Sequence, residues 1–151
     1  SLLLTAVLAQ ALRHDPEPAL PGALTSSTKR QVMTNYEDVQ YFISIAIGGQ
    51  PINGMVDTGS FDLVVFDRAC KFCGTASNYS RAASSTYRGG ALSRTLYYGS
   101  GSVDAQEAFD WVSIAPFGHV QLTFWDVTDA YMPVLNRAAF HSIIGVGPPE
   151  T

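Results

Sequence analysis

A carboxylate that directly follows an apolar run is the most chemically suggestive feature of the sequence. Asp57 comes after two apolar residues and is followed at once by Thr58, Gly59 and Ser60. The apolar pair is typical of the end of a buried strand, and Thr-Gly-Ser is typical of a tight turn. Two hydroxyl groups therefore lie within reach of a carboxylate at a strand end. Such a carboxylate can take a proton from a bound water. The alternative is an ordinary turn that its own Asp side chain caps.

Two cysteines form a Cys-x-x-Cys segment, Cys70 to Cys73. Half of a zinc site is one interpretation, but no second cysteine pair follows, and the three histidines are scattered at positions 14, 119 and 141. A redox motif is another, but the βαβ pattern of thioredoxin-like proteins is absent. A local disulfide is the interpretation favoured in a secreted chain. The sequence therefore predicts no metal site and no cofactor.

A glycine-rich turn separates two strand-like runs, Leu92–Tyr98 and Val103–Phe109. Gly-x-Gly between such runs indicates a β-hairpin. A phosphate-binding loop is the alternative, but no helical pattern and no lysine follow it. The hairpin is either a mobile lid, with Tyr98, Gly99 and Ser100 near its tip, or an ordinary edge hairpin.

Composition and length predict the elements that must position these residues. The chain has 151 residues, 46% of them hydrophobic and 15% charged, which suits one compact domain. Thirteen glycines, eight prolines and frequent β-branched and aromatic residues favour an all-β domain of hairpins. Further strands are predicted at Tyr41–Ile47, 52–56, 63–66, 111–114 and 120–127, and a short helix near Pro133. A net charge of −4 gives no electrostatic reason to expect nucleic acid or an anionic membrane as a partner.

The N-terminal residues carry the pattern of a targeting segment. Residues 1–11 contain an apolar run that ends in Ala9-Gln10-Ala11, as at the cleavage site of a signal peptide, without an initiator Met. They are interpreted as a truncated signal peptide, with a short amphipathic helix as the alternative. Residues 12–34 are rich in proline and are interpreted as a linker or short propeptide. Their Lys29-Arg30 pair is a processing site, an electrostatic plug or part of a solvated loop.

Most of the chain from Asn35 to Pro149 resembles the N-terminal lobe of a pepsin-like aspartic protease. The matching segments follow one another at the family's order and spacing: the strand around 41–47, Asp57-Thr58-Gly59-Ser60, Cys70, Ser84-Ser85-Thr86-Tyr87, Tyr98-Gly99-Ser100-Gly101-Ser102 and Ile143-Ile144-Gly145. The resemblance implies a lobe of curled β-sheets over residues 35–151.

The resemblance also implies a role for each candidate residue. Asp57 would be one of two catalytic aspartates, and residues 58–60 its active-site loop. Tyr98, Gly99 and Ser100 would form a flap over a polypeptide substrate. Cys70 and Cys73 would form a disulfide, which the family usually places in a somewhat longer loop. The sequon at Asn78 predicts a glycosylated surface position in a protein of the secretory pathway, either extracellular or in an acidic vacuole-like or lysosome-like compartment.

The sequence departs from the family pattern at two positions. The family commonly has Trp where this chain has Val64, and that Trp hydrogen-bonds the flap tyrosine. Valine has no donor, so Tyr98 is expected to find another partner or the flap to be looser. The family usually has Asp-Gly just before the segment Ile143-Ile144-Gly145, where this chain has His141-Ser142. His141 is interpreted as a surface or loop residue.

The chain contains no second Asp-Thr/Ser-Gly. The family mechanism needs two carboxylates that share a proton, one to activate water and one to hydrogen-bond the substrate carbonyl. Three interpretations follow. The chain supplies one half of a two-lobed endopeptidase whose C-terminal lobe is absent from this sequence, it is active as a symmetric homodimer, or it is a non-catalytic lobe that binds peptides or another protein.

Overall fold

The structure, a computed structural model, describes residues 29–148. Residues 1–11 and most of 12–34 lie outside this range, as do the last three residues. The described part contains strands and short 3₁₀ helices. The strands are β1 (Thr34–Tyr36), β2 (Gln40–Ile47), β3 (Gln50–Asp57), β4 (Leu63–Lys71), β5 (Arg88–Tyr98), β6 (Gly101–Ile114), β7 (Gly118–Tyr131) and β8 (Ser142–Gly145). The 3₁₀ helices are η1 (Gly74–Ala76), η2 (Arg81–Ala83) and η3 (Pro133–Arg137). The prediction of an all-β domain is confirmed.

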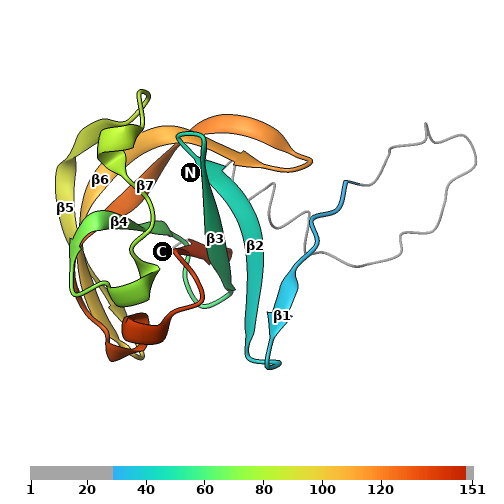
Figure 1. Cartoon of the computed structure of the whole chain (residues 1–151), viewed down its shortest axis with the longest axis horizontal. Helices are drawn as coiled ribbons and strands as arrows, with labels where there is room; N and C mark the ends of the chain where they lie inside the picture. Colours follow the sequence, from blue (N-terminus) through green and yellow to red (C-terminus); the bar gives the residue numbers. More distant parts are fainter. Residues whose placement is uncertain (1–28, 149–151) are drawn as a thin grey trace, which may run out of the picture.

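The strands form one curled sheet in the order β1-β2-β3-β8-β4-β7-β6-β5. The end of β2 also pairs with β6, at Ala46 with Ser113 and Ile47 with Val112, so the sheet folds back on itself (Figure 1). This second pairing encloses apolar side chains between the two parts of the sheet. Strands β1 and β5 remain at the ends of the strand order.

The largest correction to the predicted elements concerns β6. The sequence pattern indicated that one strand ends at Phe109 and that another begins at Trp111. The structure has a single 14-residue strand, Gly101–Ile114, which pairs along its whole length with β7. Asp110 lies in the middle of it and is fully buried, which a polarity pattern cannot anticipate. The helix predicted near Pro133 is the 3₁₀ helix η3, with the proline in its first turn.

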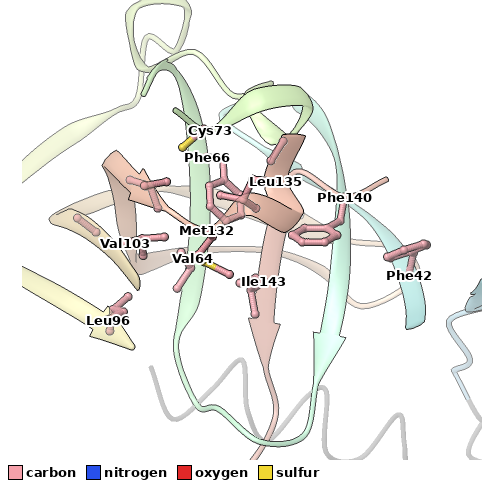
Figure 2. Packing of buried hydrophobic residues seen from close by; sticks show 14 residues of the cluster. Phe42, Val64, Phe66, Cys73, Leu96, Val103, Met132, Leu135, Phe140 and Ile143 are labelled. Atoms are coloured by element: carbon pink, nitrogen blue, oxygen red, sulfur yellow. The ribbon is translucent and has the colours of Figure 1, made fainter. Parts of the chain in front are cut away.

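Two hydrophobic clusters fill the interior. The first gathers side chains mainly from β2, β4, β6 and β7 and includes Ile47 and Phe124. The second joins β4, β8 and η3 to the hairpin of β5 and β6, as Figure 2 shows for Val64, Ile143 and Leu96. Val64 is completely buried there. Burying apolar surface in these clusters is the main favourable contribution to the fold.

Strand β8 lies beside the end of β3. It runs parallel to β3, with Asp57 opposite Gly145, and antiparallel to β4. The turn that connects β3 to β4 therefore crosses over the end of β8. This arrangement explains the sequence Ile143-Ile144-Gly145, because a buried central strand needs apolar side chains and a close crossing needs a glycine.

The Cys-x-x-Cys segment forms a disulfide between Cys70 and Cys73, at the end of β4. The prediction of a local disulfide is confirmed. Cys73 is buried, whereas Phe72 in the same short loop is 74% exposed.

Candidate active site

Asp57 is the last residue of β3, and the turn that follows holds its carboxylate. The Gly59 amide donates to Oδ1 at 2.9 Å, and the Ser60 hydroxyl donates to Oδ2 at 2.7 Å. Each carboxylate oxygen is therefore oriented by a different donor. The sequence predicted the hydroxyl of Ser60 as a donor, but the amide of Gly59 depends on the shape of the turn.

Three backbone hydrogen bonds fix this turn to the C-terminal end of β8. The amides of Gly145, Val146 and Gly147 donate to the carbonyls of Asp62, Asp57 and Ser60 at 2.9, 2.8 and 2.8 Å. The two segments approach so closely that a Cβ atom at Gly145 would lie 2.5 Å from the carbonyl carbon of Phe61. Glycine is required at that crossing because backbone cannot move aside as a flexible side chain can. The carboxylate thus stands on a rigid support, as a pre-organised site requires.

A cleft of about 720 Å³ lies between the Asp57 turn and strand β5. Asp57, Gly59 and Ser60 line it on one side, and Tyr98 and Gly99 on the other. Its remaining lining residues are Phe61, Asp62, Arg94, Thr95, Leu96, Tyr97 and Pro148. The structure therefore brings together the two segments that the sequence analysis singled out. Thr58 and Ser100 are exposed and are not among the residues that line the cleft.

Tyr98 lies half-buried on the hairpin side of the cleft. Burial raises the pKa of its phenol above the ordinary value, and the nearby carboxylates of Asp62 and Asp57 raise it further. The phenol consequently keeps its proton and can donate a hydrogen bond. Its hydroxyl makes no hydrogen bond to any residue within 29–148, and Val64, buried in the second cluster, offers no donor or acceptor side chain.

Sequence reasoning missed two charged residues of the cleft. Arg94 Nη1 lies 3.3 Å from Asp62 Oδ2, so strand β5 and the turn after Asp57 are joined by an ion pair. Asp62 is five residues after Asp57, and Arg94 is four residues before Tyr98. No local pattern relates the two, because their contact depends on the fold that places β5 opposite the turn.

Two other predicted residues lie away from the cleft. His141 precedes β8, and its Nδ1 accepts a hydrogen bond from the Asn53 amide at 3.3 Å. Burial lowers the pKa of the His141 imidazole. Asn78 is half-buried, and its amide nitrogen donates to the Pro51 carbonyl at 3.3 Å. The sequon therefore sits against β3, and glycosylation at Asn78 remains a prediction.

Residues 29–148 contain no group of three or more His, Cys, Asp and Glu side chains placed to hold a metal ion. Among the same residues, no helix has the length and apolar character needed to cross a membrane.

Comparison with known proteins identifies the family of the chain. The profile of the family "Eukaryotic aspartyl protease" matches residues 40–151. Renin of Ovis aries is 35% identical over 128 residues, which cover 81% of this chain and 32% of renin. Napsin-A of Homo sapiens is 32% identical over 123 residues, 78% of this chain and 29% of napsin-A. Cathepsin E of Cavia porcellus is 33% identical over 130 residues, 83% of this chain and 33% of cathepsin E. The chain spans about a third of the length of these curated relatives. The chain belongs to the eukaryotic aspartyl protease family.

Proposed function

We propose that residues 35–151 are the N-terminal lobe of an aspartic-type endopeptidase and that Asp57 is one of its two catalytic carboxylates. The observation that carries this proposal is the placement of Asp57. Its oxygens accept hydrogen bonds from Gly59 and Ser60, and it lines a cleft opposite the glycine-tipped hairpin of β5 and β6. The substrate is a polypeptide, and the reaction needs no cofactor.

The chemistry requires a second carboxylate across the cleft. With one proton shared between the two groups, the ionised carboxylate takes a proton from a bound water, which attacks the peptide carbonyl carbon. The protonated carboxylate hydrogen-bonds the carbonyl oxygen as negative charge develops on it. We assign the second carboxylate to a C-terminal lobe of the same protein. A second copy of the chain is the alternative, because residues 1–151 contain no other Asp-Thr/Ser-Gly.

The hairpin of β5 and β6 serves as the flap in this proposal. Tyr98 and Gly99 line the cleft, and the tip is formed by Gly99 and Ser100. A Cβ atom at Gly99 would meet nothing within 4 Å, so the tip has room to move when a peptide enters. The protonated phenol of Tyr98 supplies a hydrogen-bond donor to the bound peptide.

We further propose that the protein travels the secretory pathway, to the exterior or to an acidic vacuole-like or lysosome-like compartment. The Cys70–Cys73 disulfide supports this, because such bonds persist in oxidising compartments. We also propose that residues 1–11 are a truncated signal peptide and that residues 12–34 are a linker or short propeptide.

Replacing Asp57 by Asn tests the function. Asn keeps the size of the side chain but cannot take a proton from water, so Asp57→Asn in the protein that carries both carboxylates should lower peptide cleavage at acidic pH at least a thousandfold. Circular dichroism should remain that of a β-protein. Asp129→Asn is the matched control, because Asp129 lies on β7 and does not line the cleft. Cleavage that persists in Asp57→Asn would refute the assignment. Peptide binding without cleavage by the unaltered protein would favour the non-catalytic lobe.

A further inference from the structure

The Arg94–Asp62 ion pair joins the two sides of the candidate cleft, and we propose that it is a strap that sets the position of the flap over Asp57. Arg94 belongs to the outer arm of the hairpin, and Asp62 ends the turn that begins at Asp57. Both residues line the cleft, and their side chains meet at 3.3 Å between Nη1 and Oδ2. They act as positioning residues, because they control where Tyr98 lies relative to the carboxylate.

The Asp62 end of the strap is fixed. The carbonyl of Asp62 accepts the amide hydrogen of Gly145 at 2.9 Å, and the next residue, Leu63, begins the central strand β4. Its main chain is thereby attached to β8, which also lies beside Asp57. The Asp62 carboxylate is therefore anchored to the same strand that supports Asp57.

The Arg94 end belongs to an arm that the sheet holds weakly. Strand β5 is at the end of the strand order and is hydrogen-bonded only to β6 in the described sheet. Its register with β6 is interrupted between Gly89 and Ser93, so Arg94 lies just after the point where regular pairing resumes. The Arg94 guanidinium is also 5.8 Å from the centroid of the Trp125 ring, a cation–π contact that orients it toward the body of the sheet.

Nothing within residues 29–148 ties the flap through its tyrosine, because the Tyr98 hydroxyl makes no hydrogen bond there. The side chains of Arg94 and Asp62 are 39% and 32% exposed, so salt and substrate can reach them. Partly exposed ion pairs weaken as salt rises. The strap therefore contributes modestly to holding the hairpin near the Asp57 turn, and salt should weaken it.

Hydrogen–deuterium exchange of the whole chain tests the strap without requiring any turnover. In Asp62→Asn and in Arg94→Gln, the amides of residues 92–101 should exchange about two- to fivefold faster, the range expected for a partly exposed ion pair. Raising the salt concentration to about 0.5 M should speed exchange in the unaltered chain in the same segment. Arg94→Lys, which keeps the charge, should preserve most of the protection.

A double-mutant cycle separates the pair from general loosening. Asp62→Asn combined with Arg94→Gln should exchange no faster than the faster single variant, because each change removes the same interaction. Arg88→Gln is the control, since Arg88 lies on the same strand with its guanidinium 5.7 Å from the Phe109 ring centroid and is not part of the cleft. Unchanged exchange in both single variants, or additive effects in the double variant, would overturn the proposal.

The catalytic consequence rests on the proposed function. In the protein that carries both carboxylates, Asp62→Asn and Arg94→Gln should raise KM about two- to fivefold with a smaller change in kcat, because a looser flap must be ordered when substrate binds. If the two variants exchange faster but the protein cleaves no peptide, the proposed function is refuted and the proposed strap is supported. If the protein cleaves peptides but neither variant changes its exchange, the proposed strap is refuted and the proposed function is supported.

Discussion

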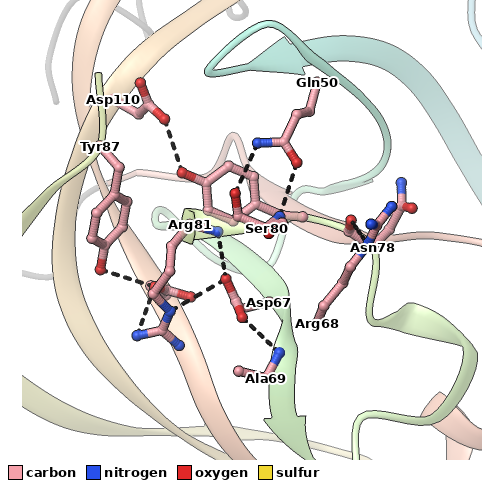
Figure 3. A network of polar contacts seen from close by, with 11 residues as sticks. Gln50, Asp67, Arg68, Ala69, Asn78, Ser80, Arg81, Tyr87 and Asp110 are labelled. Atoms are coloured by element: carbon pink, nitrogen blue, oxygen red, sulfur yellow. Dashed lines mark hydrogen bonds and ion pairs between the residues drawn. The ribbon is translucent and has the colours of Figure 1, made fainter. Parts of the chain in front are cut away.

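Two buried carboxylates, Asp67 on β4 and Asp126 on β7, share one guanidinium, and this sharing makes the stability of the fold depend on pH. Arg81 Nε lies 3.3 Å from Asp67 Oδ2, and Arg81 Nη1 lies 3.3 Å from Asp126 Oδ2. Figure 3 shows Arg81 between Asp67 and Tyr87, whose hydroxyl donates to Asp126 at 3.1 Å. Burial raises the pKa of Asp126 to about 6; Arg81 opposes the shift, whereas Asp67 adds to it. One cation cannot fully compensate two desolvated anions.

Asp126→Asn should stabilise the fold relative to the unaltered chain, and this gain should be larger at neutral pH than at pH 4. The folded state holds the Asp126 proton more tightly than the unfolded state, so the stabilising contribution is present below about pH 4 and is lost as the pH rises through about 6. Asn cannot ionise, so the variant should gain stability over the unaltered chain by about 3 kcal/mol at pH 7 and by little at pH 4. Urea unfolding across this range measures the difference. Asp129→Asn is the control, and a difference independent of pH would contradict the expectation.

Asp110 is also fully buried, but its pKa is shifted in the opposite direction to that of Asp126. Burial alone would raise its pKa, but hydrogen bonds from Thr86, Ser84 and Tyr79 outweigh burial and lower it. The Ser84 and Tyr79 hydroxyls donate to its Oδ2 at 2.7 and 2.8 Å, and Figure 3 shows Asp110 with a dashed line to one of these hydroxyls. The Ser-Ser-Thr-Tyr segment, which carried part of the family resemblance, thus solvates a buried carboxylate. Its stabilising contribution is present at neutral pH and is lost as the pH falls through the lowered pKa.

At the scale of elements, the crossing of β8 under the Asp57 turn is the feature most sensitive to a small change. A Cβ atom at Gly145 would lie 2.6 Å from the Phe61 and Asp62 amide nitrogens, and both atoms belong to backbone. Gly145→Ala should therefore destabilise the fold by about 2–4 kcal/mol, as overpacking at an unyielding position does. The loss is measurable as a lower midpoint of urea unfolding.

Gly99→Ala is the matched control for this prediction. A Cβ atom at Gly99 would meet nothing within 4 Å, so the substitution should change the unfolding midpoint very little. Equal midpoints for the two variants would show that the crossing accommodates a side chain and that Asp57 is less rigidly supported than its hydrogen bonds indicate.

At the scale of the whole molecule, strand β5 forms an edge that can pair with another chain. It is eleven residues long, and its side chains are mostly exposed, with Leu92 58% and Tyr97 81% accessible. An unpaired strand edge with exposed apolar side chains promotes association. We expect residues 35–151 alone to self-associate and to cleave no peptide at low concentration, because Asp57 cannot perform both carboxylate roles.

Size-exclusion chromatography with light scattering, run beside a peptide-cleavage assay over a concentration series, measures both properties. Leu92→Lys combined with Tyr97→Lys should reduce association without altering the Asp57 turn. Cleavage that increases faster than protein concentration would favour a homodimer as the source of the second carboxylate. A monomer whose cleavage per molecule is independent of concentration would contradict the need for a second carboxylate.

The sequence by itself determined the class of the fold, the strand end that carries Asp57, the glycine-tipped hairpin and the disulfide. Each of these depends on residues that are close together along the chain: apolar runs before a turn, glycines between strand-like runs, and two cysteines three residues apart. The resemblance to aspartic proteases followed from the order of the same local segments.

Only the tertiary structure decided which distant residues meet. Arg94 pairs with Asp62, and Arg81 pairs with Asp67 and Asp126. Gly145 lies against Phe61. These contacts form because the curled sheet inserts β8 between β3 and β4 and places β5 on the other side of the cleft. Isolated charged residues in strands look like solvent-facing positions in the sequence. Their burial or pairing depends on sheet closure, which is a long-range property that no local pattern contains.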